Sequence, residues 1–283
     1  MKITFNTIWV DDNTDFVGAL KMSLENWLDE KGLKLNVFEH TKADGVLENI
    51  RGNEIELIIV DYKLPGRDGD KLIEEIRDSG FYQDIIFYSG SKLPDTKFDG
   101  VFYVSKEDAN KRIKELIELK LRRFSDPASV RGWIVADSIE LESMITELLT
   151  LCFTERVGFT FADRLLHRTD TPSIDFYGKH KLVNGMLKDY IALLDTEESN
   201  NRQRIDVLRS YRKIFNTFAD EIIHVRNALA HQKVEESASG AVIKTMTSSA
   251  ASITLNEESF IKMRKDIRKH HTNLSDLLSI LRE

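Results

Sequence analysis

The chain has 283 residues, which is enough for two domains, and 41% of them are apolar. A net charge of −7 argues against a protein that coats DNA through bulk positive charge. The single cysteine, Cys152, excludes an intramolecular disulfide and fits a reducing cytoplasm. No apolar run reaches the ~18 residues that a membrane-spanning helix needs, and no signal peptide is expected at the N-terminus.

Predicted strands and helices alternate through residues 1–124. Short runs rich in β-branched residues predict strands, and apolar residues three or four apart predict the helices between them. Thr14 is expected to cap the first helix, and Gly32 to end it. Such alternation is typical of an α/β domain with a doubly wound, five-stranded parallel sheet covered on both faces. The predicted strands span residues 8–10, 33–38, 55–60, 85–88 and 101–104, and the predicted helices span residues 14–31, 42–50, 70–79 and 109–124.

Polar side chains follow four of these strands. Asp11 and Asp12 come directly after the first strand, and Asp61 after the third. Ser89 and Lys106 follow the fourth and the fifth. Open α/β sheets place their chemistry at the carboxyl ends of the strands, so we expect these side chains to gather at one edge of the sheet.

The segment 61–69 organises this edge. Pro65, Gly66 and Gly69 make the loop after Asp61 tight. A carboxylate in such a place is either a metal ligand or a nucleophile. Three carboxylates close together cannot all stay ionised unless a cation compensates them. Mg²⁺, a hard ion that prefers oxygen ligands, is the cation that this pattern predicts.

With the acidic pair, the aspartate, the hydroxyl and the lysine in this order, residues 1–124 resemble the response-regulator receiver family. The resemblance implies that Asp12 and Asp61 bind Mg²⁺ directly and that Asp11 binds it through water. It adds the backbone carbonyl of Lys63 as a further ligand. Asp61 would attack a phosphohistidine on a partner sensor histidine kinase and become an aspartyl phosphate.

The same resemblance assigns three residues around the phosphate. Lys106 would hold the phosphoryl oxygens, Ser89 would turn to bond the new phosphate, and Tyr103 would swing inward behind it. Without the motif around it, Tyr103 is better interpreted as an ordinary strand aromatic. The sequence departs from the family at Glu107, where a proline is usual. Residues 90–100 show no helical period, so we expect the family's fourth helix to be shortened or lost.

Residues 125–129 break the last helix of this region and predict a linker. Beyond it, alternation gives way to helices alone, so an all-α domain is expected over residues 130–283. A small β-hairpin between residues 241–246 and 253–255 is possible. Helices are expected over residues 130–153, 175–194, 202–232 and 257–283, with residues 159–167 forming a helix or turn and residues 196–201 a polar loop.

One segment of the second half, residues 224–231, carries a recognisable motif. On a regular helix, Asn227 and His231 share a polar face, whereas Arg226 and His231 point about 140° apart. Arg226, Asn227 and His231 resemble the arginine, polar residue and histidine that mark the HEPN superfamily of helical domains. Many members of that family are metal-independent ribonucleases that pair the motif across a homodimer, which would supply the missing side of the site.

Two functions remain open for the helical domain. In the first, Arg226 binds the scissile phosphate of RNA and His231 acts as general acid or base. Asn227 would orient either His231 or the scissile phosphate. In the second, the domain is not an enzyme and only dimerises or binds a protein partner under phosphorylation control. No cofactor is expected in this domain. Sequence-specific DNA binding is not expected either, because no helix-turn-helix with a basic recognition helix is found.

Overall fold

The computed structural model describes residues 4–90, 97–123, 126–156, 174–196, 202–237, 240–243 and 253–282. The chain divides into two compact units, residues 2–124 and residues 125–283. The predicted helix or turn at residues 159–167 and the predicted loop at residues 197–201 lie outside the described residues. Among the described residues, no helix is both long enough and apolar enough to cross a membrane.

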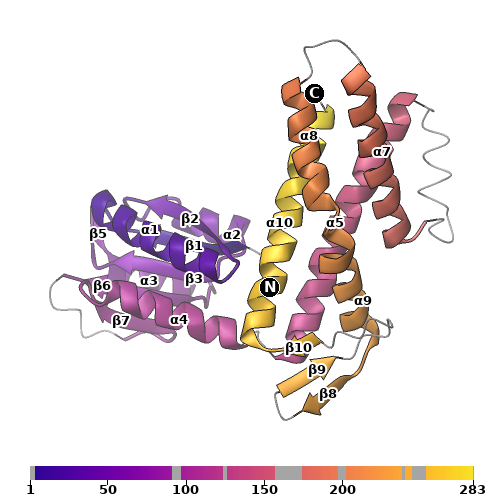
Figure 1. The fold of residues 1–283 in the computed structure, drawn as a ribbon. Coiled ribbons are helices and arrows are strands. Elements are labelled where there is room, and N and C mark those ends of the chain that lie inside the picture. Colours follow the sequence, from indigo (N-terminus) through magenta and orange to yellow (C-terminus); the bar gives the residue numbers. More distant parts are fainter. Residues whose placement is uncertain are drawn as a thin grey trace. The chain divides into compact units, whose positions relative to one another are not determined.

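A five-stranded sheet forms the centre of the first unit (Figure 1). Its strands all run parallel in the order β2-β1-β3-β6-β7, so the predicted doubly wound fold is confirmed. Neighbouring carboxyl ends are level, because Val10 pairs with Val60 and Ser89 with Ser105. The strands are β1 (Thr4–Val10), β2 (Lys34–His40), β3 (Leu57–Asp61), β6 (Asp84–Ser89) and β7 (Val101–Ser105).

Helices cover both faces of this sheet, and β-branched residues alternate between the two faces. The face covered by α2 (Val46–Gly52) and α3 (Gly69–Asp78) is apolar. On the other face, α1 (Thr14–Glu30) and α4 (Ala109–Arg123) lie side by side, joined by an ion pair of 2.9 Å between Lys31 and Glu118 (Figure 1). The α2/α3 face buries Ile8, Val10, Ile58, Val60, Ile85 and Phe87 of the sheet.

Local chemistry shifts two of the predicted boundaries in this unit. Asn13, not Thr14, caps α1, because its side-chain oxygen accepts a hydrogen bond from the backbone N–H of Phe16 at 3.1 Å. Gly32 follows the helix with a φ of 76°, as expected of a glycine that ends a helix. Between β6 and β7, residues 97–100 hold no helix, and residues 91–96 lie outside the described part.

The second unit is mostly helical, as predicted, with a small sheet beside the helices (Figure 1). The possible hairpin is present as β9 and β10, and a third strand, β8, extends it. The helices are α5 (Pro127–Arg156), α7 (Phe176–Thr196), α8 (Arg202–Phe215), the π-helix η1 (Ala219–Ile223), α9 (His224–His231) and α10 (Glu257–Arg282). The strands are β8 (Val234–Ser237), β9 (Gly240–Ile243) and β10 (Ile253–Leu255).

The predicted linker 125–129 is mostly helix. The helix α5 begins at Pro127, and the side chain of Asp126 accepts hydrogen bonds from the backbone N–H groups of Ala128 and Ser129, each at 3.0 Å. Proline suits the first helical position because its missing N–H would be unpaired there in any case. Residues 126–129 therefore cap and begin the helix α5.

The single helix predicted over residues 202–232 is wrong. It is broken after Phe215, and the chain then passes through the π-helix η1 before α9 begins. A side chain from another helix explains the break: the ring nitrogen Nε2 of His180 lies 3.0 Å from the backbone oxygen of Phe215. This contact engages a carbonyl that a continuous helix would bond to its own next turn.

Candidate functional site

The carboxylates predicted at the strand ends lie together. Asp11, Asp12 and Asp61 each place an oxygen within 4.8 Å of the others. Asp11 and Asp61 are buried, whereas Asp12 is exposed. The ammonium of Lys106 reaches both buried carboxylates, at 3.1 Å from Asp11 and 3.7 Å from Asp61. The parallel register brings residues from three distant places in the sequence to one edge of the sheet.

Burial and mutual repulsion act on Asp61. Burial, and next the neighbouring charge of Asp11, raise the pKa of Asp61 from 3.8 to about 6, although Lys106 opposes this. One ammonium therefore does not compensate two buried carboxylates and an exposed third. The donors are hard oxygens with one exposed side, and they fit Mg²⁺, which keeps part of its water shell when bound. Asp12 and Asp61 would hold the ion, with Asp11 behind them.

The loop after Asp61 is built so that the chain can pass close to it. Lys63 pairs with Asp68 in a two-strand ladder, β4 (Lys63–Leu64) with β5 (Arg67–Asp68). Pro65 and Gly66 form its turn, and Gly66 takes a φ of 85°, as the third position of a type II turn requires. A Cβ atom at Gly69 would lie 2.2 Å from the backbone oxygen of Asp61. Only glycine therefore fits where α3 begins.

Ser89 and Tyr103 occupy different surroundings. Ser89 is buried at the end of β6, and its backbone oxygen accepts a hydrogen bond from the N–H of Lys106 at 2.9 Å. Tyr103 packs its ring against Phe87 on the α2/α3 face, and its hydroxyl accepts a hydrogen bond from the N–H of Phe98 at 2.9 Å.

Sequence reasoning missed a buried tyrosine at this site. The hydroxyl of Tyr88 donates a hydrogen bond to Asp11 Oδ2 at 2.6 Å and accepts one from the indole N–H of Trp9 at 2.8 Å. Burial, and then the bond to Asp11, raise the pKa of Tyr88, so the phenol stays a neutral donor. The alternation of strand side chains was the available signal, because Trp9 and Asp11 are two apart and share a face.

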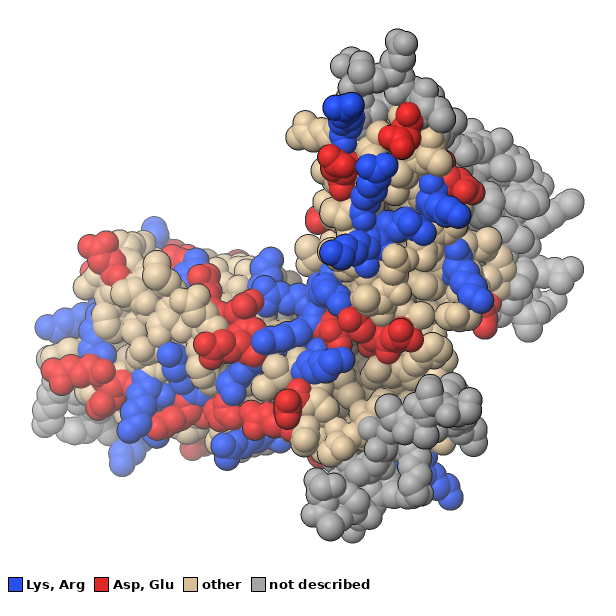
Figure 2. Space-filling model, viewed as in Figure 1, with Lys and Arg blue, Asp and Glu red and all other residues tan. Residues whose placement is uncertain are grey.

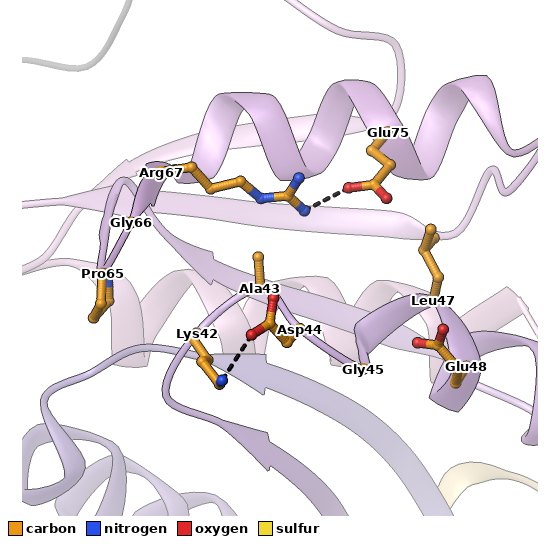
Figure 3. Close-up of a pocket in the computed structure, with 10 residues that line it drawn as sticks. All are labelled: Lys42, Ala43, Asp44, Gly45, Leu47, Glu48, Pro65, Gly66, Arg67 and Glu75. Atoms are coloured by element: carbon orange, nitrogen blue, oxygen red, sulfur yellow. Dashed lines mark hydrogen bonds and ion pairs between the residues drawn. The ribbon is translucent and has the colours of Figure 1, made fainter.

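A hollow of about 470 Å³ lies beside the loop after β3 (Figure 3). Its walls come from the segment that leads into α2 and from the residues between β4 and α3. Charges of both signs line it, and two ion pairs form within it, Lys42 with Asp44 and Arg67 with Glu75 (Figure 3). Glu48 is the fifth charged residue of the lining, so two positive side chains face three negative ones.

In the second unit, the motif residues lie on α9. The guanidinium of Arg226 donates to the side-chain oxygen of Asn227 at 3.0 Å. Asn227 and His231 are exposed, as expected of a shared polar face, and Leu229 between them is fully buried. Arg131 of α5 donates to the backbone oxygens of Leu229 and Gln232, each at 2.6 Å, and so fixes the end of the helix that carries His231.

Basic side chains gather on α8, and Figure 2 shows Lys and Arg concentrated on this face of the second unit. Part of that charge is paired locally, since Arg209 lies 3.4 Å from Asp195 and 3.6 Å from Asp206. The guanidinium of Arg204 lies over the ring of Tyr190 at 5.9 Å. The face is positively charged but not uniformly so.

A partly buried polar cluster joins η1 to α10. Glu221 accepts hydrogen bonds from Thr217, Lys269 and His270, and His270 is completely buried. Burial alone would raise the pKa of Glu221, but these donors outweigh it and the pKa is lowered. Burial lowers the pKa of His270 to about 4, so a neutral imidazole donates to an ionised carboxylate. The cluster holds the π-helix in place.

Comparison with known proteins identifies the first unit only. Residues 8–118 match the family model "Response regulator receiver domain". No curated protein matches the chain. Among solved structures, the chain is similar to the signal receiver domain of an HD domain-containing protein from Pseudomonas fluorescens Pf-5, with 20% identity, 44% of this chain and 90% of that chain covered, and a TM-score of 0.36. It is also similar to a CheY-like receiver domain protein from Methanospirillum hungatei JF-1, with 21% identity, coverage of 42% and 98%, and a TM-score of 0.34.

Proposed function

We propose, from the response regulator receiver domain that residues 8–118 form, that the protein is a two-component response regulator whose Asp61 accepts a phosphoryl group from a sensor histidine kinase. The observation that carries this proposal is the meeting of Asp11, Asp12, Asp61 and Lys106 at one sheet edge. A surface cluster of acids would not bury two carboxylates beside a lysine.

Each residue of the site would have a separate role in phosphoryl transfer. An oxygen of Asp61 forms the new P–O bond as the P–N bond of the phosphohistidine breaks. The ammonium of Lys106 lies near both buried carboxylates, so it can move from Asp11 to form an ion pair with a phosphoryl oxygen on Asp61. Bound Mg²⁺ would neutralise the negative charge of the transferred group, with Asp12, Asp61 and the carbonyl of Lys63 as its ligands and Asp11 behind water. Ser89 lies at the same edge and would bond the acquired phosphate.

The test uses the full chain and a small phosphodonor. Acetyl phosphate with Mg²⁺ should label the wild-type protein, and Asp61→Asn should reduce labelling below about 1% of that level, because the attacking oxygen is gone. Asp68→Asn is the matched control, since that exposed carboxylate lies in the same loop and should leave labelling unchanged. Undiminished labelling of Asp61→Asn would mean that the nucleophile lies elsewhere.

For the second unit, we propose a HEPN-like output domain that acts as a homodimer and cleaves RNA without a metal. The contact between Arg226 and Asn227, and the exposure of His231 on the same helix, support it. The RNA 2′-hydroxyl would attack the adjacent phosphate and form a 2′,3′-cyclic phosphate as the bond from phosphorus to the 5′-oxygen of the next nucleotide breaks. Arg226 would hold the phosphate, and His231 would either take the 2′-hydroxyl proton or give a proton to the departing 5′-oxygen. A second copy of α9 would have to face the first, because one regular helix does not point Arg226 and His231 at one atom.

An RNA cleavage assay in the presence of EDTA tests this output. His231→Ala should lose at least about 100-fold in rate, as expected for removal of a general acid or base. His224→Ala is the control, because His224 is exposed one turn from Asn227 but lies outside the motif. If the intact protein leaves varied RNAs uncut with and without a phosphoryl analogue, the alternative holds, and the helical domain dimerises or binds a protein partner without catalysis.

A further inference from the structure

The carboxylate of Asp11 is surrounded by donors from its own chain. Its Oδ1 accepts the backbone N–H of Asn13 at 2.8 Å. Its Oδ2 accepts two donors at once, the hydroxyl of Tyr88 at 2.6 Å and the ammonium of Lys106 at 3.1 Å. Of these three donors, Lys106 has the long flexible side chain, and its ammonium also lies 3.7 Å from Asp61.

Burial and a second hydrogen bond hold the phenol of Tyr88 against Asp11. Trp9, Tyr88 and Asp11 are all buried at 2% exposure or less. The indole N–H of Trp9 donates to the phenol oxygen at 2.8 Å and thereby directs the phenol proton to Asp11. The indole N–H of Trp9 can only donate, so the phenol oxygen is the acceptor of this bond, and the phenol proton is then free to be donated to the carboxylate of Asp11.

Aromatic rings also support the resting position of Lys106. Its ammonium lies 4.6 Å from the ring centroid of Phe16 and 5.3 Å from that of Tyr88. The two rings meet edge to face, with centroids 5.7 Å apart. Tyr88 therefore contacts both members of the Lys106–Asp11 ion pair, one through its hydroxyl and the other through its ring.

We propose that Tyr88 is a positioning residue for phosphoryl transfer: its hydroxyl keeps Asp11 hydrogen-bonded when Lys106 leaves Asp11 for the phosphoryl group on Asp61. This inference rests on the proposed function of Asp61. Removing one donor from a buried carboxylate is costly, and a second donor that stays in place lowers this cost. Without the hydroxyl, Lys106 would be the one side chain of the described residues that donates to Asp11 Oδ2, and Asp11 would hold it more strongly.

The test is a double-mutant cycle on the labelling rate of the full chain with acetyl phosphate at saturating Mg²⁺. Tyr88→Phe keeps the ring and should slow labelling about tenfold, the lower end expected for loss of a hydrogen bond to a charged group. In a Lys106→Ala background, the same substitution should change the rate less than about twofold, because Tyr88 acts through Lys106. Tyr82→Phe is the matched control, as Tyr82 is 75% exposed, and should leave the rate unchanged.

A merely structural role would slow both backgrounds equally, and that result, or an unchanged rate in Tyr88→Phe, overturns the proposal. If Tyr88→Phe does not fold, Trp9→Phe takes its place, because it frees the phenol proton to turn away from Asp11 and should show the same dependence on Lys106. Absence of labelling in the wild-type protein would instead count against the proposed function of Asp61, so the two failures are distinguishable.

Discussion

The two units place their candidate functional groups in opposite ways. In the receiver unit, Asp11, Asp61 and Lys106 come from three different strands and meet in a largely buried cluster. In the helical unit, Arg226, Asn227 and His231 come from the single helix α9, and the last two face solvent. A site assembled from several strand ends is complete within one chain. A site that lies on one helix needs a partner surface to complete it.

Two buried groups, Asp61 of the receiver unit and His270 of the helical unit, respond to acid in opposite directions. In the receiver unit, burial raises the pKa of Asp61 to about 6, so without Mg²⁺ the native state binds a proton at Asp61 more tightly than the unfolded chain does. In the helical unit, burial lowers the pKa of His270 to about 4, so the native state prefers the uncharged imidazole. As the pH falls below about 6, Asp61 should therefore add to the free energy of unfolding of the first unit, and His270 should subtract from that of the second.

The largest effect is expected at the closest approach in the receiver unit. Gly69→Ala would drive a Cβ to 2.2 Å from the backbone oxygen of Asp61, and we expect a loss of more than about 3 kcal/mol in the free energy of unfolding. Gly18→Ala is the matched control, because nothing lies within 4 Å of a Cβ at that position in α1, and it should stabilise by up to about 1 kcal/mol. Denaturant unfolding measures both; a Gly69→Ala protein as stable as the wild type would contradict the described loop.

The next effect concerns the helical unit in acid. As the pH falls from about 6.5 towards 4, the imidazole of His270 becomes protonated in the unfolded chain but stays neutral in the folded chain, where its pKa is about 4. The opening free energy of α10 should therefore drop by about 2–3 kcal/mol. Hydrogen exchange of α10 amides at several pH values measures this. His270→Gln, which keeps a donor towards Glu221, should show a smaller drop over that range; an equal drop would mean that His270 is not the group responsible.

A smaller effect of opposite sign is expected in the receiver unit. Above pH 6 without Mg²⁺, the charged Asp61 costs the folded state on the order of 1–2 kcal/mol after allowance for solvent screening. Asp61→Asn should therefore raise the opening free energy of β3 by this amount at pH 7 and change it little near pH 4. Mg²⁺ should stabilise the wild type and not the variant. A gain that is the same at both pH values would point to a cause other than titration.

The receiver edge was predictable because its signals are local. Each of its polar residues directly follows an apolar run, and the parallel register then aligns the ends of those runs. The role of Tyr88 was not predictable in the same way, because its partner Asp11 lies 77 positions away and a tyrosine in a strand is ordinarily a packing residue. The break after Phe215 was missed for the same physical reason, since the competing group, His180, is supplied by another helix.

We propose that charge added at Asp61 changes how two copies of the helical unit meet. Sedimentation velocity of the full chain with Mg²⁺, with and without beryllofluoride as a phosphoryl analogue, tests it most directly. Our account predicts a shift in the distribution of assembly states for the wild-type protein and none for Asp61→Asn. A wild-type distribution that stays the same when the analogue is shown to be bound would contradict it.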